Sequence, residues 1–240
     1  MLQVNGLSKD FGGLRALDDV SFEVHEGEVV GLIGPNGSGK STAFNVISGF
    51  LPASEGSVTF LGEEITHLPA HKVAQRGMAR TFQLVRPFLH LSTLDNVVAG
   101  SFFDRGKLSS RREAEGRAYE ILELVGMVEK AQDMARTLTV MERKWLEVAR
   151  ALACDPHLLL LDEFMAGLNH SEIPQAVALV RKLNEAGVTI IIVEHIVKAI
   201  TRTSERIIVL NAGRKLAEGS AAEVVQDPAV IAAYLGTEAV

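Results

Sequence analysis

The sequence is poor in cysteine, and its one cysteine, Cys154, rules out an internal disulfide and a cysteine-based zinc cluster. Small and apolar neighbours in the stretch ALACDP predict that Cys154 is a packed small residue and not a reactive thiol. The sequence also lacks an 18-residue apolar run, and its N-terminus lacks a charged start followed by an apolar core. We therefore expect neither a membrane span nor a signal peptide, and a chain that stays in the cytoplasm.

Positive charge is also in short supply. The sequence has 30 Asp and Glu and 24 Lys and Arg, which gives a formal net charge of -6, and no block of basic residues is longer than a pair such as Arg111 and Arg112. Because proteins that grip nucleic-acid phosphates usually carry a basic face, no nucleic-acid partner is expected. No Ser/Gly-rich or Pro-rich linker divides the 240 residues, so the sequence predicts one domain spanning 1–240 with subdomains.

Two kinds of apolar pattern predict two kinds of strand. Apolar and polar residues alternate over 20–24 and 58–60, which is typical of antiparallel strands with one face in water. Continuous apolar runs over 29–33, 158–161 and 188–193 are bounded by glycine or proline and predict parallel strands covered by helices on both faces.

Helical patterns separate these strands, so the sequence predicts an α/β core. The helices are expected over 42–48, 113–125, 144–153 and 171–186. From about residue 84 to residue 135 the strand runs disappear, which predicts a helical subdomain inserted into the core, while the early alternating strands form an antiparallel β subdomain. The chain is expected to end with a strand at 207–210, a turn at 212–213 and short helices at 222–225 and 230–234.

The most specific motif follows the buried strand 29–33. Gly34 is separated by four residues from Gly39, Lys40 and Ser41, immediately before a helix, which is the spacing and context of a P-loop. Its glycines let backbone N–H groups face phosphates, Lys40 can reach the β- and γ-phosphate oxygens, and the Ser41 hydroxyl can bind Mg²⁺. The predicted nucleotide-binding residues of this loop are Gly34, Pro35, Asn36, Gly37, Ser38, Gly39, Lys40, Ser41 and Thr42.

Charged and polar residues follow two other predicted core strands. Asp162 and Glu163 directly follow the run 158–161. Asp162 is therefore expected to hold hydrated Mg²⁺, and Glu163 is expected to face the water near the γ-phosphate. His195 ends the run 188–193 and is expected to donate to a γ-phosphate oxygen, because ligands of open α/β sheets bind at the carboxyl ends of the strands.

With these motifs the whole chain resembles the ATP-binding subunits of ABC transporters. The resemblance implies that Gln83, in ARTFQ, contacts Mg²⁺ and the attacking water, that Phe11 stacks on adenine, and that Glu163 is the general base. It also implies ATP and Mg²⁺ as cofactors. The stretch LPAHKVAQRGMARTFQLVRPF, the AGLN loop and the closing AYLG are most similar to ATPases of branched-chain amino acid importers and less so to those of lipopolysaccharide export.

The sequence departs from this family in two loops. The family's signature, usually Leu-Ser-Gly-Gly-Gln, aligns with the stretch beginning at Leu138 and Thr139, where Val140 and Met141 replace the two glycines. These side chains hinder a close backbone approach to phosphate, although the following helix still offers its N-terminal amides. After Glu163, Phe164 and His170 stand where the family usually has proline.

The resemblance implies partners as well as an activity. We expect two ATPase subunits to hydrolyse ATP on the cytoplasmic face of the inner membrane. Their partners are expected to be membrane permease subunits and, indirectly, a periplasmic or extracellular substrate-binding protein. The altered signature would contact the ATP held by the partner subunit, and a homodimer would carry this alteration in both sites. A heterodimer is therefore favoured over a homodimer. The alternatives are a lipopolysaccharide-export ATPase, a soluble ABC ATPase acting on nucleic acid or ribosomes, and a P-loop kinase. The acidic composition and the single cassette argue against a soluble ABC ATPase acting on nucleic acid or ribosomes. A P-loop kinase would not need the set of Gln83, the signature stretch and His195.

Overall fold

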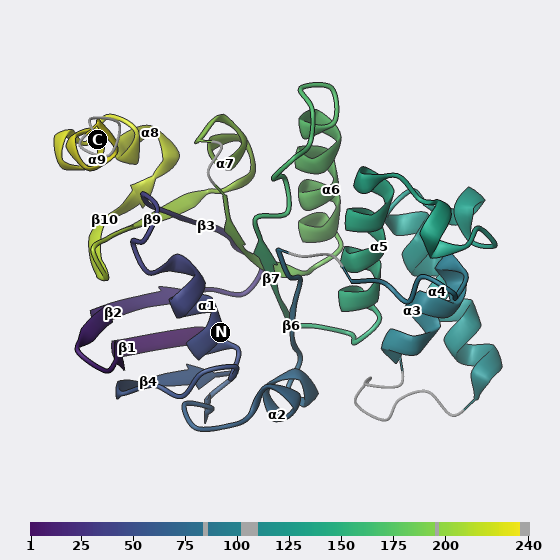
Figure 1. Cartoon of the computed structure of the whole chain (residues 1–240), viewed down its shortest axis with the longest axis horizontal. Coiled ribbons are helices and arrows are strands. Elements are labelled where there is room, and N and C mark those ends of the chain that lie inside the picture. The colour runs from purple at the N-terminus through teal and green to yellow at the C-terminus, as the bar shows by residue number, and fades with distance from the viewer. Residues whose placement is uncertain (84–85, 102–109, 195–196, 236–240) are drawn as a thin grey trace. The chain divides into compact units, whose positions relative to one another are not determined.

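The computed structural model describes residues 1–83, 86–101, 110–194 and 197–235 (Figure 1). Two compact units make up the chain. The first unit contains Met1–Val73 and Thr189–Val240, and the second unit contains Ala74–Val188. In the part of the chain that the structure describes, no helix combines the length and the apolar composition needed to cross a membrane.

An antiparallel sheet forms the start of the first unit, as the alternating sequence pattern predicts. Its strand order is β2-β1-β4-β5, and each neighbouring pair is antiparallel. Leu2, Val20 and Val58 point to a common buried face, with exposed fractions of 0%. The strands are β1 (Leu2–Phe11), β2 (Leu14–Val24), β4 (Glu55–Phe60) and β5 (Glu63–Glu64).

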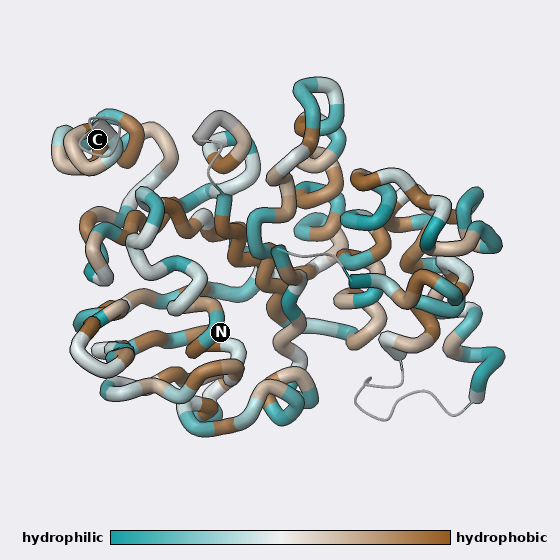
Figure 2. Tube along the Cα trace, in the orientation of Figure 1, coloured by the Kyte–Doolittle hydropathy of each residue, from teal (hydrophilic) through white to brown (hydrophobic). Residues whose placement is uncertain are grey.

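The first unit also contains the parallel strands that carry the P-loop. Strand β3 (Val29–Ile33) pairs in parallel with β8 (Thr189–Val193) on one side and with β9 (Arg206–Asn211) on the other. Every residue of β3 and β8 is buried, and Figure 2 shows β3 and β9 as hydrophobic stretches. The parallel arrangement of β3 and β8 confirms the prediction made from their unbroken apolar runs.

Strand β10 (Arg214–Ser220) pairs antiparallel with β9 after a turn at 212–213, where Ala212 and Gly213 both have positive φ. The sequence did not predict β10 because its residues, RKLAEGS, are mostly exposed and carry no apolar run. The helices of the first unit are α1 (Lys40–Ile47), α7 (Val197–Thr203), α8 (Ala221–Val224) and α9 (Pro228–Leu235), and α2 (Ala70–Gln75) crosses into the second unit.

The second unit is mainly helical around a pair of parallel strands, β6 (Met78–Arg80) and β7 (Leu158–Asp162). Its helices are α3 (Thr93–Ser101), α4 (Arg111–Leu124), α5 (Val140–Leu152) and α6 (Ile173–Glu185), with 3₁₀ turns at Val128–Lys130 and Ala135–Thr137. Described residues between 84 and 135 are therefore helical or irregular, apart from an isolated bridge of Ser92 with Met134. The insertion of this segment as a separate subdomain stays a prediction.

Helix α5 begins four residues before its predicted start at Lys144. The reason is a capping box: the Thr139 hydroxyl accepts from the Glu142 N–H, and the Glu142 carboxylate accepts from the Thr139 N–H. The sequence also missed β6 and α3, since a three-residue strand and a helix of mixed composition leave a weak pattern.

Candidate functional site

The P-loop of the first unit runs from the end of β3 into α1, and two of its glycines are required by close backbone contacts. A Cβ added to Gly34 would lie 2.1 Å from the Leu210 carbonyl oxygen, and one added to Gly39 would lie 2.8 Å from that of Ala16. Both residues also have positive φ, of 154° and 104°. Any other residue at these positions would displace the loop from the strands beneath it.

Lys40 lies at the centre of this loop. Its side chain is 4% exposed, and its Nζ donates to the carbonyl oxygens of Gly34 at 2.7 Å and Pro35 at 3.0 Å and to the Ser38 hydroxyl at 3.4 Å. Oxygen atoms of the loop thus hold the Lys40 ammonium beside the start of α1. A buried ammonium next to a helix N-terminus favours a bound anion such as a phosphate chain.

The remaining P-loop residues differ in exposure. Pro35 and Ser38 are buried, Thr42 is half-buried, and Asn36, Gly37 and Ser41 are exposed, so backbone and hydroxyl groups of the loop are open to a ligand. Phe11 ends β1 in the same unit; its ring is 45% exposed and has the Lys9 Nζ 5.2 Å from its centroid. An exposed ring of this kind can stack on a base, and the contact with adenine stays a prediction.

Three predicted catalytic and metal-binding residues lie together in the second unit. The Gln83 Nε2 donates to Glu163 Oε2 at 2.6 Å, and Asp162, which ends β7, immediately precedes Glu163. The structure therefore brings the glutamine that the family resemblance selected into contact with the carboxylate that follows the strand. In this position Gln83 orients one oxygen of the Glu163 carboxylate.

Asp162 has a partner that the sequence did not predict. Arg80, at the end of β6, forms an ion pair with Asp162 at 2.6 Å, and both side chains are only 7% exposed. A buried charge is costly unless it has a partner, and in this ion pair each side chain supplies the partner of the other. No motif marks Arg80 in the sequence, because its position opposite Leu160 depends on the pairing of β6 with β7.

The segment that carries Gln83 is anchored by Glu147 of α5, another residue that sequence reasoning missed. The Phe82 N–H donates to the Glu147 carboxylate at 2.8 Å. Burial raises the pKa of Glu147, and this Phe82 N–H and the charge of Arg150 offset the rise only in part. The backbone just before Gln83 is therefore tied to the helix that follows the signature stretch.

The turn after Glu163 explains one departure from the family. Glu163 has a positive φ of 47°, which ends β7 and turns the chain away. Phe164 is then buried, with its ring 5.1 Å from that of Trp145, and its carbonyl accepts from the Lys144 Nζ at 3.0 Å. At a position that the family usually gives to proline, this chain has an aromatic residue packed on α5.

His195 lies outside the described residues, so its expected donation to a γ-phosphate stays a prediction. The preceding Glu194 is described, and it is 1% exposed at the end of β8. Within the described chain no cluster of three or more His, Cys, Asp or Glu side chains could hold a metal ion. A site built on a single carboxylate, a hydroxyl and an amide would not form such a cluster.

The signature stretch of the second unit forms the start of α5. The capping box occupies the Thr139 and Glu142 amides, and the Thr139 N–H lowers the pKa of Glu142, so the box carries a negative charge at neutral pH. The Val140 side chain is 65% exposed at the first position of the helix. The end of α5 that would meet a phosphate thus presents a carboxylate and a branched apolar side chain.

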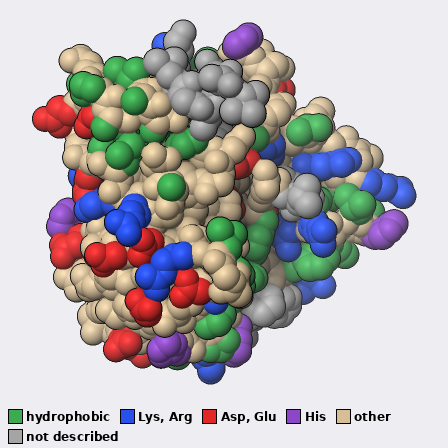
Figure 3. All heavy atoms as spheres, turned by 60° about the vertical axis from the view of Figure 1, so that its left-hand side comes forward, with side chains coloured by type: hydrophobic (Ala, Val, Ile, Leu, Met, Phe, Trp, Pro, Cys, Tyr) green, Lys and Arg blue, Asp and Glu red, His purple; other side chains and the backbone are tan. Residues whose placement is uncertain are grey.

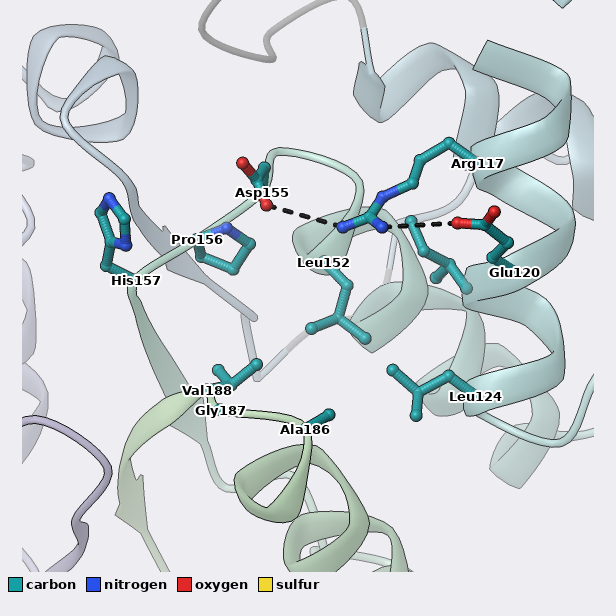
Figure 4. Close-up of a pocket in the computed structure, with 11 residues that line it drawn as sticks. Arg117, Glu120, Leu124, Leu152, Asp155, Pro156, His157, Ala186, Gly187 and Val188 are labelled. Carbon is teal, nitrogen blue, oxygen red and sulfur yellow. Dashed lines mark hydrogen bonds and ion pairs between the residues drawn. The ribbon is translucent and has the colours of Figure 1, made fainter. Parts of the chain in front are cut away.

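A cavity of about 430 Å³ in the second unit is separate from the predicted site residues (Figure 4). Arg117 lines this cavity and points between Asp155, with which it pairs at 3.5 Å, and Glu120, with which it pairs at 3.4 Å, and Leu124 and Leu152 also line the cavity. These charges neutralise one another in part.

The surface of the first unit also carries charges of both signs. Figure 3 shows basic and acidic side chains side by side. Arg15 of this unit forms ion pairs with Asp10, Asp18 and Glu55.

Two protein-family models match parts of this chain. The ABC transporter family matches residues 17–166, and the branched-chain amino acid ATP-binding cassette transporter family matches residues 214–240. The chain is 40% identical to the high-affinity branched-chain amino acid transport ATP-binding protein BraF of Pseudomonas aeruginosa, covering 98% of both chains. It is 37% identical to the corresponding LivG of Escherichia coli, again over 98% of both, and 34% identical to the lipopolysaccharide export ATP-binding protein LptB of Escherichia coli, over 99% of this chain and 98% of LptB.

Solved structures show the same fold. The ADP conformation of MJ1267, an ATP-binding cassette of an ABC transporter, superposes with a TM-score of 0.89 at 32% identity over 98% of both chains. The dimeric structure of MJ0796, a bacterial ABC transporter cassette, gives 0.81 at 29% identity over 92% of this chain and 99% of that one.

Fold and P-loop together define a nucleotide-binding ATPase of the P-loop class. Within that class the chain belongs to the ABC transporter family, as one of its ATP-hydrolysing cassettes.

Proposed function

We propose that this chain is the ATP-hydrolysing subunit of an ABC importer for branched-chain amino acids. The observation that carries the ATPase part is the P-loop, with a buried Lys40 held by the loop's own carbonyl oxygens at the start of α1. The substrate class is supported by the match of residues 214–240 to the branched-chain amino acid cassette family and by the similarity to BraF and LivG along the whole chain.

Each site residue takes a role that its chemistry supports. The loop Gly34–Thr42 binds the phosphates, with Lys40 as the cation for the β- and γ-phosphate oxygens, and Phe11 stacks on the base. Glu163, oriented by Gln83, accepts the proton of the attacking water, and His195 donates to the γ-phosphate. The hydrogen bond between Gln83 and Glu163 supports the pairing of these two roles.

Mg²⁺ fits the donor set that these roles provide. It prefers oxygen ligands and keeps several of its waters, and Ser41, Asp162 and Gln83 offer a hydroxyl, a carboxylate and an amide oxygen. The amide nitrogen of Gln83 is turned to Glu163, which leaves its oxygen as an acceptor, and Arg80 engages only Oδ2 of Asp162 among the described contacts. The ion would neutralise charge on the phosphates while these residues hold it or its waters in place.

The working assembly is a dimer of ATPase subunits on the cytoplasmic face of the inner membrane, bound to membrane permease subunits that carry the substrate path. A periplasmic or extracellular binding protein would deliver the amino acid to those subunits. The dimeric structure of a similar cassette supports the pairing of two ATPases. The exposed Val140 and the anionic capping box at the signature stretch support a different ATPase as the partner.

A lipopolysaccharide-export system is the second candidate, because the chain is 34% identical to LptB. Purification from detergent-solubilised membranes followed by mass spectrometry separates the two. Copurifying permeases of the amino acid importer type support the proposal, whereas copurifying lipopolysaccharide-export subunits contradict it.

The ATPase part is tested by Lys40→Ala. Because this change removes the cation that the P-loop gathers, we expect tight binding of a fluorescent ATP analogue with Mg²⁺ to be abolished. Lys72→Ala, at an exposed position of α2, is the matched control and should bind as the wild type does. Unchanged affinity in Lys40→Ala would mean that the nucleotide site has been wrongly assigned.

A further inference from the structure

The short segment that leads from β6 to Gln83 is held by hydrogen bonds to two different elements. Toward β7, the Thr81 N–H donates to the Leu160 carbonyl at 2.9 Å. Toward α5, the Phe82 N–H donates to Glu147 Oε1 at 2.8 Å. The contact with Glu147 is therefore made by the residue directly before Gln83, and it ties this part of the segment to a helix and not to the sheet.

The side chain of Phe82 contributes little to holding this segment. Its ring is 43% exposed, with the Arg80 Cζ 5.2 Å from its centroid. A ring that stays largely in water gains only part of the free energy that full burial provides. The position of the segment at Phe82 therefore depends on the backbone hydrogen bond to the half-buried Glu147 more than on side-chain packing.

The same face of α5 also holds the chain that carries Glu163. Lys144 precedes Glu147 by three residues, and residues three apart lie on one face of a helix. The buried Lys144 Nζ donates to the carbonyl of Phe164 at 3.0 Å. One face of α5 thus contacts the residue before Gln83 and the residue after Glu163.

Between these two contacts lies the hydrogen bond that joins Gln83 to Glu163. The Gln83 Nε2 donates to Glu163 Oε2 at 2.6 Å, although Gln83 is exposed and Glu163 is half-buried. An exposed side chain has several rotamers available, so its orientation depends on where its backbone is fixed. A segment released from Glu147 would let the Gln83 backbone move relative to Glu163.

We infer that Glu147 is a positioning residue for ATP hydrolysis: by accepting from the Phe82 N–H, it fixes the backbone from which Gln83 orients Glu163. This inference rests on the proposed roles of Gln83 and Glu163. The hydrogen bond that the structure describes for the Glu147 side chain goes to Phe82 and not to the P-loop. Loss of Glu147 should therefore lower kcat and leave the KM for Mg²⁺-ATP unchanged.

The first experiment measures phosphate release by the full chain at varied Mg²⁺-ATP. Methionine at position 147 is unbranched and of similar length but cannot accept from the Phe82 N–H, so Glu147→Met should lower kcat about tenfold with KM within about twofold of the wild type. Glu147→Gln keeps an acceptor oxygen and should restore kcat to within about threefold. Glu123→Met, the same change at an exposed position of α4, is the matched control and should leave both constants unchanged.

The second experiment asks whether Glu147 acts through Gln83. Gln83→Ala should itself lower kcat, because Glu163 loses the group that orients it. Adding Glu147→Met to Gln83→Ala should lower kcat no further, since the side chain that Glu147 positions is already absent. A residue that served only to stabilise α5 would lower kcat by the same factor in both backgrounds.

Hydrogen exchange of the Phe82 amide measures the contact itself and needs no turnover. In the wild type this amide should exchange slowly although the Phe82 ring is exposed. In Glu147→Met it should exchange about tenfold faster or more, because its acceptor is lost, and in Glu147→Gln it should stay within about threefold of the wild type.

The outcomes separate this inference from the proposed function. A wild-type kcat in Gln83→Ala contradicts the proposed role of Gln83. The positioning role alone is overturned by a wild-type kcat in Glu147→Met, by a further loss of the same size in the Gln83→Ala background, or by unchanged exchange of the Phe82 amide. Should Glu147→Met fail to fold, Glu147→Asp takes its place with the same expectations, because its side chain keeps the carboxyl group but is one methylene too short to reach the Phe82 N–H.

Discussion

At the scale of single residues, we propose that hydrolysis depends most on the carboxylate of Glu163. Gln83 donates to one of its oxygens at 2.6 Å, and Glu163 itself has left the buried strand with a positive φ, so the carboxylate is oriented but not enclosed. Such a group can take a proton from water while a neighbour holds its orientation. Arg80 gives the adjacent Asp162 a similar support by a buried ion pair.

Replacing Glu163 by Gln should leave nucleotide bound and slow hydrolysis by about 10²-fold or more, because an amide can hydrogen-bond the water without accepting its proton. Steady-state phosphate release together with ATP binding measures both effects, and long-lived ATP-bound dimers should accumulate. Glu185→Gln, at an exposed position at the end of α6, controls for the loss of one negative charge. Turnover of Glu163→Gln within about twofold of the wild type would remove Glu163 from the role of base.

How far the site could be read from the sequence depends on how local each signal is. The P-loop can be recognised from the sequence because its glycines, lysine and serine lie within one loop, and the structure places this loop between a strand and a helix. Arg80 and Glu147 were missed, since the first depends on the register of β6 against β7 and the second on where α5 packs. Gln83 and Phe11 came from the family resemblance alone, because isolated residues of these types carry no signal.

At the scale of elements, the sequence at the start of α5 fits two interpretations, a helix capping box and an altered signature stretch. Thr139 and Glu142 have the spacing of a capping box, a signal present in the sequence, yet the stretch was interpreted as an altered signature and the helix was expected to begin at Lys144. The structure shows the box. Strand β10 is the opposite case, since an exposed polar strand gives no pattern from which it could be predicted.

Removing the cap of α5 should destabilise the chain by about 1 kcal/mol, the usual effect of losing an N-cap hydroxyl. Thr139→Val keeps the shape of the side chain and removes the acceptor for the Glu142 N–H, and for a chain of this size the melting temperature should fall by about 2–4 °C. Thr139→Ser retains the hydroxyl and should differ from the wild type by only a few tenths of that energy. Equal melting temperatures for the Val and Ser variants would show that the cap contributes nothing.

The same box makes a prediction about pH. The Thr139 N–H lowers the pKa of Glu142 in the folded chain, so the carboxylate stabilises the fold above its unfolded pKa, and this contribution is lost as the pH falls through the folded pKa. The stability difference between the wild type and Glu142→Gln should therefore be present at pH 7 and shrink in acid below about pH 4.3. Thermal melts of both proteins across this range measure it, and a constant difference would contradict it.

At the scale of the whole molecule, the replacement of the two signature glycines by Val140 and Met141 affects which ATPase dimer we expect. The family resemblance implies a head-to-tail dimer in which each ATP lies between one subunit's P-loop and the other's signature stretch. In such a dimer an altered signature here would affect the partner's ATP and not the ATP that we propose Lys40 binds. A homodimer would carry the alteration in both of its sites, whereas a partner with signature glycines would complete a competent site over this chain's P-loop.

The chain alone should therefore hydrolyse ATP slowly and accelerate when its partner ATPase and the membrane subunits are present. Changing both Val140 and Met141 to Gly should raise the activity of the isolated chain, because the exposed Val140 side chain no longer stands where the backbone must approach phosphate. Val128→Gly, which truncates another exposed valine of the second unit, is the control and should not activate. The measurement is phosphate release by the purified chain and by the assembled transporter. If the isolated chain is as fast as the assembly, and the double glycine variant is no faster, the altered signature is silent and the argument for a heterodimer fails.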